Sequence, residues 1–266
     1  MFDGHGPEGH LCAKRAQEHV TAQFVDGMKD DIKGGLDTSE HISSTLKSAY
    51  RRTSQRLESG EEGIDASHSG TTAVSLFITK DSLHTANVGD SRCLLIEHDT
   101  QGKTSVKALT LDHTPDREDE IKRIEAHGGV VMTSDQYDIN DPSFTSFEQK
   151  RIWSKSGKWP GTAFTRSIGD AVAKELGVSA DPECSSFPLP EIATFVLGSD
   201  GIFDFIPDEE IGTIVKNYDN PEDACRELVG KAWNRWCESE ERADDITVIV
   251  GKIKNSRGGV LEKFRR

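Results

Sequence analysis

The chain has 266 residues, and its 46 acidic against 32 basic side chains give a formal net charge of -14 at pH 7. This length suffices for one large domain with a substantial buried core, and the 34% of hydrophobic and 29% of charged residues are typical of a soluble globular protein rather than a disordered one. The acidic surplus argues against nucleic acid as the main partner, because it repels phosphate backbones, and no apolar run approaches the ~18 residues that a membrane helix needs.

The first part of the chain changes from helices to strands. The spacing of its apolar residues predicts a helix over residues 9–25, and a second helix follows the Asp37-Thr38-Ser39 cap signal and ends before Gly60. Short runs rich in β-branched residues then predict an antiparallel meander, with strands at residues 71–79, 82–88, 92–97 and 106–111.

The second part mixes helices, strands and loops. A helix is predicted over residues 115–127, because Thr114 can cap it, Pro115 fits its first turn and Gly128 ends it. The polar stretch 133–160 is typical of a loop or flap, and residues 161–176 combine helical and irregular parts. The remaining predicted elements are strands at 130–132, 192–197 and 246–253 and helices at 207–216 and 221–238.

The order of these elements indicates the fold class. No internal repeat and no low-complexity linker divides the chain, so we expect a single domain followed by a basic, solvated tail at residues 254–266. Helices, then strands, then helices and strands differ from the regular alternation that builds a parallel sheet. The sequence therefore predicts an α+β fold in which helices cover an antiparallel core.

Four acidic motifs stand at the ends of β-rich runs. They are Phe2-Asp3-Gly4-His5-Gly6, Asn87-Val88-Gly89-Asp90-Ser91-Arg92, Gly198-Ser199-Asp200-Gly201-Ile202-Phe203-Asp204 and Arg242-Ala243-Asp244-Asp245-Ile246-Thr247. Each motif alone is explained by a tight turn, since Asp-Gly is a common turn dipeptide. Together they suit one metal centre, because magnesium and manganese prefer oxygen ligands and carboxylates at strand ends can converge. No HExxH or CxxC motif supports zinc.

The number and spacing of the cysteines indicate the cellular compartment of the protein. The five cysteines are widely scattered, which argues against a disulfide framework and favours reduced thiols. They are Cys12, Cys93, Cys184, Cys225 and Cys237. Residues 1–10 also lack the basic and apolar segments of a secretory signal. We expect an intracellular protein, located in the cytoplasm, the nucleus or both.

With these motifs in order, the sequence resembles the metal-dependent protein phosphatases of the 2C type over nearly its whole length. The motifs that carry the resemblance are FDGHGPEGH at 2–10, SGTTAV at 69–74, ANVGDSR at 86–92, LDHTPDREDEIKRI at 111–124, GTAFTRSIGD at 161–170, SDGIFD at 199–204 and ADDITVIV at 243–250. The resemblance implies that residues 1–253 form a four-layer αββα sandwich, with two antiparallel sheets flanked by helices. It also implies hydrolysis of phosphoserine and phosphothreonine in protein substrates with two magnesium or manganese ions and a third, weaker one.

The resemblance further implies roles for individual residues. Asp3 matches the carboxylate that bridges two metal ions, and Gly4 matches the residue whose carbonyl binds one of them. His5 matches the proposed general acid, so Asp3 and His5 form the expected catalytic pair. The other matched metal ligands are Asp200 and Asp244 for the two main ions and Asp90 and Asp204 for the weaker one.

The resemblance also leaves alternatives open. The family's opening strands, an acidic residue near the metals and an arginine that binds substrate phosphate have no match before Phe2, so we expect an N-terminally incomplete domain. The retained carboxylates favour an active phosphatase, whereas the missing segment favours a truncated, non-catalytic pseudo-phosphatase acting as a regulatory or interaction module. A third alternative is another metallohydrolase that acts on small phosphate esters.

Charged residues outside this set carry three further expectations. Arg166 and Asp170 are expected to form an ion pair that fixes a loop near the site. Arg92 is expected to orient neighbouring groups rather than to bind phosphate. The run Glu118–Glu120 is expected to form a solvated helix face near the helix N-terminus, where the dipole favours acidic side chains.

Overall fold

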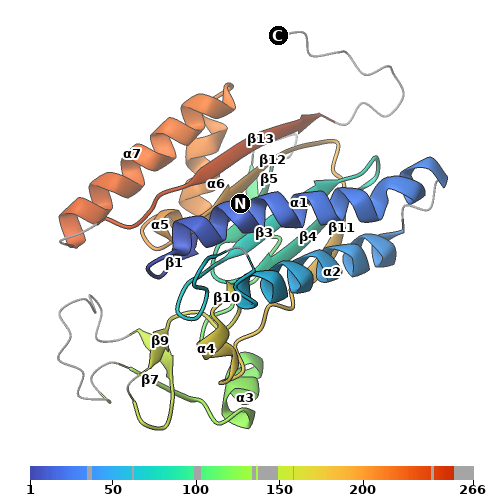
Figure 1. Cartoon of the computed structure of the whole chain (residues 1–266). Helices are drawn as coiled ribbons and strands as arrows, with labels where there is room; N and C mark the ends of the chain where they lie inside the picture. The colour runs from blue at the N-terminus through green and yellow to red at the C-terminus, as the bar shows by residue number, and fades with distance from the viewer. Residues whose placement is uncertain are drawn as a thin grey trace.

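Two long helices form the outer layer on one side of the molecule (Figure 1). The structure is a computed structural model that describes residues 1–34, 38–61, 63–98, 103–133, 136, 149–157, 159–240 and 243–254. Helix α1 (Gly9–Gly34) continues past its predicted end, and α2 (Ser39–Glu58) begins as predicted. The hydroxyl of Thr38 caps α2 by accepting a hydrogen bond from the His41 N–H at 3.3 Å.

The first sheet lies under these helices. Its strands are antiparallel in the order β11 (Glu183–Pro188), β4 (Ser82–Val88) and β3 (Ala73–Ile78). Side chains of β4 alternate between two cores, so that Ala86 and Val88 face the helices while Leu83 faces the second sheet. The sequence did not predict β11, because its polar residues lack the pattern of a buried strand.

The second sheet and its helices complete the sandwich. The strands run in the order β13 (Val248–Lys254), β12 (Ile192–Gly198), β5 (Arg92–His98) and β6 (Thr104–Ala108). Helices α5 (Asp200–Phe203), α6 (Asp208–Lys216) and α7 (Pro221–Ser239) supply the fourth layer. The α+β prediction and the implied αββα layering are therefore confirmed.

The predicted single meander is wrong. Strands β3 and β4 form one hairpin and β5 and β6 another, and the two hairpins belong to different sheets. The turn between β4 and β5 contains Gly89 at φ +97°, a conformation that suits glycine and redirects the chain from one sheet to the other. Across the gap, Leu83 of the first sheet packs in one core with Cys93 and Leu95 of the second. Because β4 and β5 are buried on both faces, their sequences did not show which neighbours they choose.

Strands β3 and β13 are edge strands of their respective sheets, and both contribute residues to one groove. An apolar groove of about 620 Å³ lies between these two strands and α1. Met1 covers one end of β3, since its amino group donates to the carbonyl of Val74 at 2.6 Å. Among the described residues, no helix combines the length and the apolar character needed to cross a bilayer.

A small lobe lies at one end of the sandwich (Figure 1). It contains the antiparallel sheet β7 (Val130–Thr133), β8 (Lys150–Trp153) and β9 (Pro160–Thr162), with α3 (Glu118–Ala126) and α4 (Ala171–Lys174) beside it. The loop prediction for 133–160 is thus wrong at β8 and at the start of β9. Residues 137–148 of that stretch, and the predicted tail from residue 255 onward, lie outside the described residues.

Helix α3 begins later than predicted. Residue Arg117 occupies the position before its first turn, and Thr114 does not cap the helix. The chain instead turns at Pro115, where the Arg117 N–H donates to the carbonyl of Thr114 at 3.2 Å. The helix proper starts at Glu118, since only from there does the backbone continue in α conformation.

Candidate active site

A cavity of about 330 Å³ lies where strand ends of the sandwich meet the small lobe. Of the predicted site residues, the structure places six in its lining: Asp3, Gly4, His5, Asp90, Asp200 and Asp244. Asp90 follows β4, Asp200 follows β12 and Asp244 precedes β13, so the expected convergence of strand ends is present. The seventh residue, Asp204, lies outside this lining, at the end of α5.

Backbone contacts fix the turn that carries Asp3 and Gly4. The carbonyl of Asp3 accepts hydrogen bonds from the Thr72 N–H at 2.8 Å and from the Thr71 hydroxyl at 2.9 Å. The Asp3 N–H donates to the Thr72 hydroxyl at 3.1 Å. A Cβ on Gly4 would meet the carbonyl oxygen of Gly9 at 2.2 Å, so only glycine fits this close approach between the turn and α1.

A buried serine joins the two acidic turns of the second sheet. The Ser199 hydroxyl donates to the carbonyl of Asp245 at 2.8 Å and accepts from the Thr247 N–H at 3.0 Å. Each carboxylate is also held locally, because Asp200 Oδ1 accepts from the Gly201 N–H and Asp244 Oδ1 accepts from the Asp245 N–H, both at 2.7 Å. These bonds hold the turns after β12 and before β13 side by side.

The carboxylates of the cavity repel one another. Burial, followed by the charges of neighbouring aspartates, raises the pKa of Asp3, Asp90 and Asp200 above the ordinary value. The same causes raise the pKa of Asp204 to about 6. Several ionised carboxylates so close together destabilise the fold unless bound cations neutralise their charge. Oxygen donors are the ligands that magnesium and manganese prefer. The residues present therefore fit a divalent-metal centre.

His5 is held by a carboxylate on a different segment. Its Nε2 lies 2.7 Å from Oδ2 of Asp170, and its ring stacks on Phe164 with a centroid distance of 4.2 Å. Burial alone would lower the pKa of His5, but the charge and hydrogen bond of Asp170, with the charges of Asp90 and Asp3, raise it overall. The imidazole is thus biased toward its protonated form.

A three-stranded ribbon brings His5 and Asp170 together. Strand β2 (Gly70–Thr71) pairs with β1 (Gly4–His5) on one side and with β10 (Ile168–Gly169) on the other. Asp170 follows β10 in the left-handed region at φ +54°, and its N–H donates to the carbonyl of Ser69 at 2.9 Å. A Cβ on Gly70 would lie 2.0 Å from Oδ2 of Asp170, so the glycine of the SGTTAV motif makes room for this carboxylate.

Arg92 orients neighbouring groups, as expected. Its guanidinium donates to both oxygens of Asp112, at 3.1 and 2.6 Å, and to Oδ1 of Asp208 at 2.6 Å. Asp112 belongs to the site because its charge raises the pKa of both Asp90 and Asp204. The sequence analysis did not identify this residue. Its position in the LDHTPD motif was the available signal.

Comparison with known proteins agrees with this geometry. The sequence profile described as protein phosphatase 2C matches residues 1–240. The chain belongs to the protein phosphatase 2C family. It is therefore a member of a family of phosphoric monoester hydrolases, and the prediction of a protein phosphatase is confirmed at this level.

Individual relatives support the assignment. The phosphatase is 37% identical over 264 residues to "Probable protein phosphatase 2C 35" of Arabidopsis thaliana, and this match covers 96% of the chain and 73% of the relative. It is 28% identical over 252 residues to "Probable protein phosphatase 2C 61" of the same plant, covering 94% and 73%. A solved serine-threonine phosphatase 2C from Toxoplasma gondii shares the fold, with a TM-score of 0.77 at 18% identity over 94% of this chain and 82% of that one.

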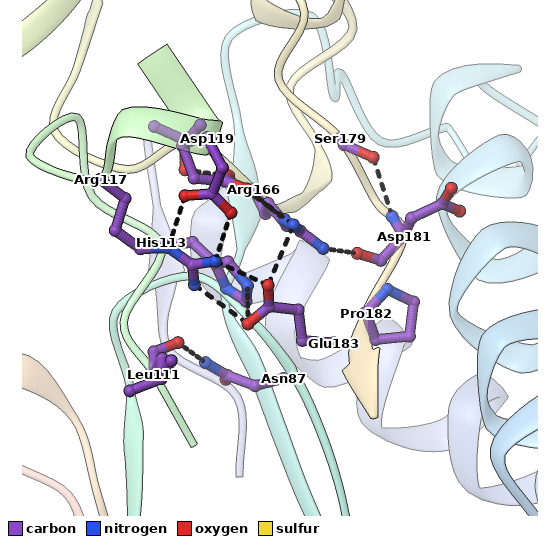
Figure 2. Close-up of polar contacts among 12 residues, drawn as sticks. Asn87, Leu111, His113, Arg117, Asp119, Arg166, Ser179, Asp181, Pro182 and Glu183 are labelled. Carbon is purple, nitrogen blue, oxygen red and sulfur yellow. Dashed lines mark hydrogen bonds and ion pairs between the residues drawn. The ribbon is translucent and has the colours of Figure 1, made fainter. Parts of the chain in front are cut away.

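The expected ion pair between Arg166 and Asp170 is wrong. Figure 2 shows the Arg166 guanidinium directed toward Glu183 and toward the carbonyl of Asp181, to which it donates at 2.8 Å. Its main partner is Glu120, with Nη2 at 2.6 Å from Oε1. Asp170 instead pairs with His5. No local sequence pattern around residues 166–170 indicates this pairing.

The expected solvated face of α3 is also wrong at Glu120, which is fully buried. The oxygens of Asp119, Glu120 and Glu183 lie within 4.8 Å of one another, the only acidic trio at this spacing among the described residues. Their charges are balanced by the guanidinium groups of Arg117, Arg123 and Arg166. Because arginines occupy these oxygens, this trio of the phosphatase is an ion-pair cluster rather than the predicted metal centre (Figure 2).

Proposed function

We propose that the phosphatase hydrolyses phosphoserine and phosphothreonine in intracellular protein substrates and depends on magnesium or manganese. The observation that carries this proposal is the convergence of Asp3, Asp90, Asp200 and Asp244 with His5 on one cavity. A pseudo-phosphatase would have no need to keep this repulsive set assembled. The carboxylates that the chain retains in this cavity therefore favour catalysis over a purely regulatory or interaction module.

The carboxylates would hold the metal ions. Asp3, the carbonyl of Gly4, Asp200 and Asp244 would bind the two main ions, and Asp90 with Asp204 would bind a third. When bound, such ions lower the pKa of water and neutralise charge on phosphoryl oxygens. The fixed turns described above keep the ligands in place before any ion binds, so little reorganisation is needed.

His5 would act as the general acid. In the imidazolium form its Nε2–H donates to Asp170, so the proton on Nδ1 is the one available for the leaving serine or threonine oxygen. Asp170 keeps the ring oriented and favours the charged form. The ring of Phe164 packs against the imidazole at a tilt of 37°, with 4.2 Å between the ring centroids.

A direct assay tests this proposal. We expect the chain to release phosphate from a phosphothreonine peptide only when magnesium or manganese is present, and chelation should abolish this turnover. Parallel assays with p-nitrophenyl phosphate test the alternative of a small-ester hydrolase, which would prefer that compound to the peptide. Metal-independent hydrolysis would contradict the proposal, and a folded, metal-binding chain without turnover would favour the pseudo-phosphatase.

Asp170→Asn tests the role of the carboxylate behind His5. Asparagine keeps the shape and an acceptor oxygen but removes the charge, so we expect kcat to fall about 10²-fold. Because the charge of Asp170 raises the pKa of His5, its loss should also move the alkaline limb of the kcat–pH profile to lower pH. Steady-state kinetics between pH 6 and about 9 measure both effects.

The matched control is Asp181→Asn. Asp181 pairs with Arg51 on the surface and does not line the cavity, so its loss should leave both kcat and the pH profile unchanged. A variant at Asp170 that retains wild-type kcat and an unshifted profile would refute the assigned role.

A further inference from the structure

The cavity contains one arginine among its acidic residues. Arg151, on β8 of the small lobe, is the only arginine or lysine in the cavity lining that the structure describes. It shares this lining with five aspartates: Asp3, Asp90, Asp170, Asp200 and Asp244. We therefore expect this single cation among many carboxylates to have a function in the site.

The small lobe holds the guanidinium in place. Strand β8 is the central strand of its sheet, and Arg151 stands opposite Met132 of β7. Its Nη1 donates to the carbonyl of Gly161 at 2.8 Å, and its Nη2 donates to Oε1 of Gln149 at 3.0 Å. Since Gly161 lies in the cavity wall, the first bond ties the guanidinium to that wall. Burial lowers the pKa of Arg151, but a guanidinium remains charged at neutral pH.

We infer that Arg151 binds the phosphoryl group of the substrate, an inference that rests on the proposed function. A phosphoryl group presents several negative oxygens, and the planar guanidinium fork matches two of them at once. In their ionised form the aspartates of the cavity are acceptors only and cannot bind an anion directly. Arg151 therefore supplies, from the lobe, an anion-binding group that the strand ends lack.

The position of Arg151 separates binding from chemistry. His5 and its partner Asp170 come from the ribbon β1–β2–β10, whereas Arg151 comes from the lobe sheet β7–β8–β9. Loss of a charge-assisted hydrogen bond to an anion weakens binding about 10- to 100-fold. We expect this loss in the KM for phosphopeptide and in the inhibition constant of inorganic phosphate, with a smaller effect on kcat.

Three variants test the inference. Arg151→Ala removes the guanidinium, and Arg151→Lys keeps a charge on a flexible stem but cannot form the fork. Lys150→Ala is the matched control, because Lys150 is the adjacent cation on β8, pairs with Asp116 at 2.9 Å and does not line the cavity. For each variant we would measure kcat, KM for a phosphothreonine peptide, product inhibition by inorganic phosphate, and the thermal unfolding curve.

The inference predicts that KM and the phosphate inhibition constant rise about 10-fold or more in Arg151→Ala, rise less in Arg151→Lys and stay constant in Lys150→Ala. Values within twofold of wild type in a folded Arg151→Ala protein would overturn it, as would a fall in kcat alone. Should Arg151→Ala unfold, the comparison of Arg151→Lys with wild type decides, since a purely structural role is expected to leave phosphate inhibition unchanged in that folded variant.

A binding measurement separates this inference from the proposed function. Calorimetry with inorganic phosphate and manganese reports binding without turnover. If wild type binds phosphate but hydrolyses no phosphopeptide, the proposed function fails while the comparison with Arg151→Ala still decides the role of the arginine. If wild type hydrolyses the peptide and Arg151→Ala binds phosphate equally well, only the role of Arg151 fails.

Discussion

Replacing Asp200 by asparagine is expected to lower kcat/KM for a phosphothreonine peptide at least about 10³-fold. Asp200 stands at the start of α5, and its carboxylate is aimed into the cavity beside Asp3 and Asp244. Asparagine keeps the size and one oxygen of the side chain but removes the charge that a divalent ion requires. Steady-state kinetics at saturating manganese measure the loss.

The same substitution should stabilise the metal-free protein. The pKa of Asp200 is raised in the folded state, so the folded protein binds this proton more tightly than the unfolded chain does. Stability therefore falls as the pH rises from the unfolded pKa toward the folded one, and Asp200→Asn removes this loss. Thermal unfolding in chelator from pH 4 to about 8 should show a flatter profile for the variant, and manganese should stabilise wild type more than the variant.

Asp245→Asn is the matched control for this pair of effects. It makes the same chemical change at the neighbouring residue of the acidic turn before β13, and Asp245 does not line the cavity. We expect it to retain near wild-type activity. If Asp200→Asn kept more than about a tenth of wild-type kcat/KM, Asp200 would not be a metal ligand.

Glu120→Gln is expected to lower the free energy of unfolding by about 3–5 kcal/mol at pH 7. Glu120 is fully buried and accepts hydrogen bonds from Arg123, Arg166 and the hydroxyl of Thr165, at 2.7, 2.6 and 2.5 Å. Burial by itself would raise the pKa of Glu120, but these donors outweigh burial and hold that pKa far below its usual range. Glutamine removes the charge that balances two arginines, which is why the expected effect is large.

The contribution of Glu120 to the free energy of unfolding depends on pH. Because the folded pKa is depressed, the stabilising contribution of Glu120 is present above the unfolded pKa and is lost as the pH falls through the folded value. Urea unfolding at pH 7 and at about pH 3 should therefore show a smaller difference between wild type and variant at the lower pH. Glu118→Gln is the control, since Glu118 is almost fully exposed. A loss below about 1 kcal/mol at pH 7 would mean that the cluster contributes no more than a surface ion pair.

Glu120 also connects the lobe to the site. Glu120 accepts hydrogen bonds from Thr165 and Arg166. These residues lie on the same segment as Phe164 and Asp170, both of which contact His5. A destabilised cluster should therefore lower activity at temperatures where the protein is still folded. The ion-pair cluster of Figure 2 is thus joined through this one segment to the residues beside His5.

Local patterns in the sequence determined much of this protein. The apolar stripe and Thr38 cap of α2, the short strand β4 and the buried run of β12 depend on neighbours within a few residues, which a sequence displays directly. The motifs around Asp3, Asp90, Asp200 and Asp244 also marked the carboxylates that the structure gathers in one cavity. Short-range stereochemistry, together with the resemblance to known phosphatases, was sufficient for these features.

Only the tertiary structure decided the pairings between distant segments. His5 and Asp170 are 165 residues apart, and Arg166 and Glu120 are 46 apart, so no periodicity links either pair. The separation of β4 and β5 into two sheets and the place of Arg151 in the cavity likewise depend on how the layers pack. The physical reason is that a charge selects its partner by distance and burial after folding, and neither quantity is a property of the local sequence.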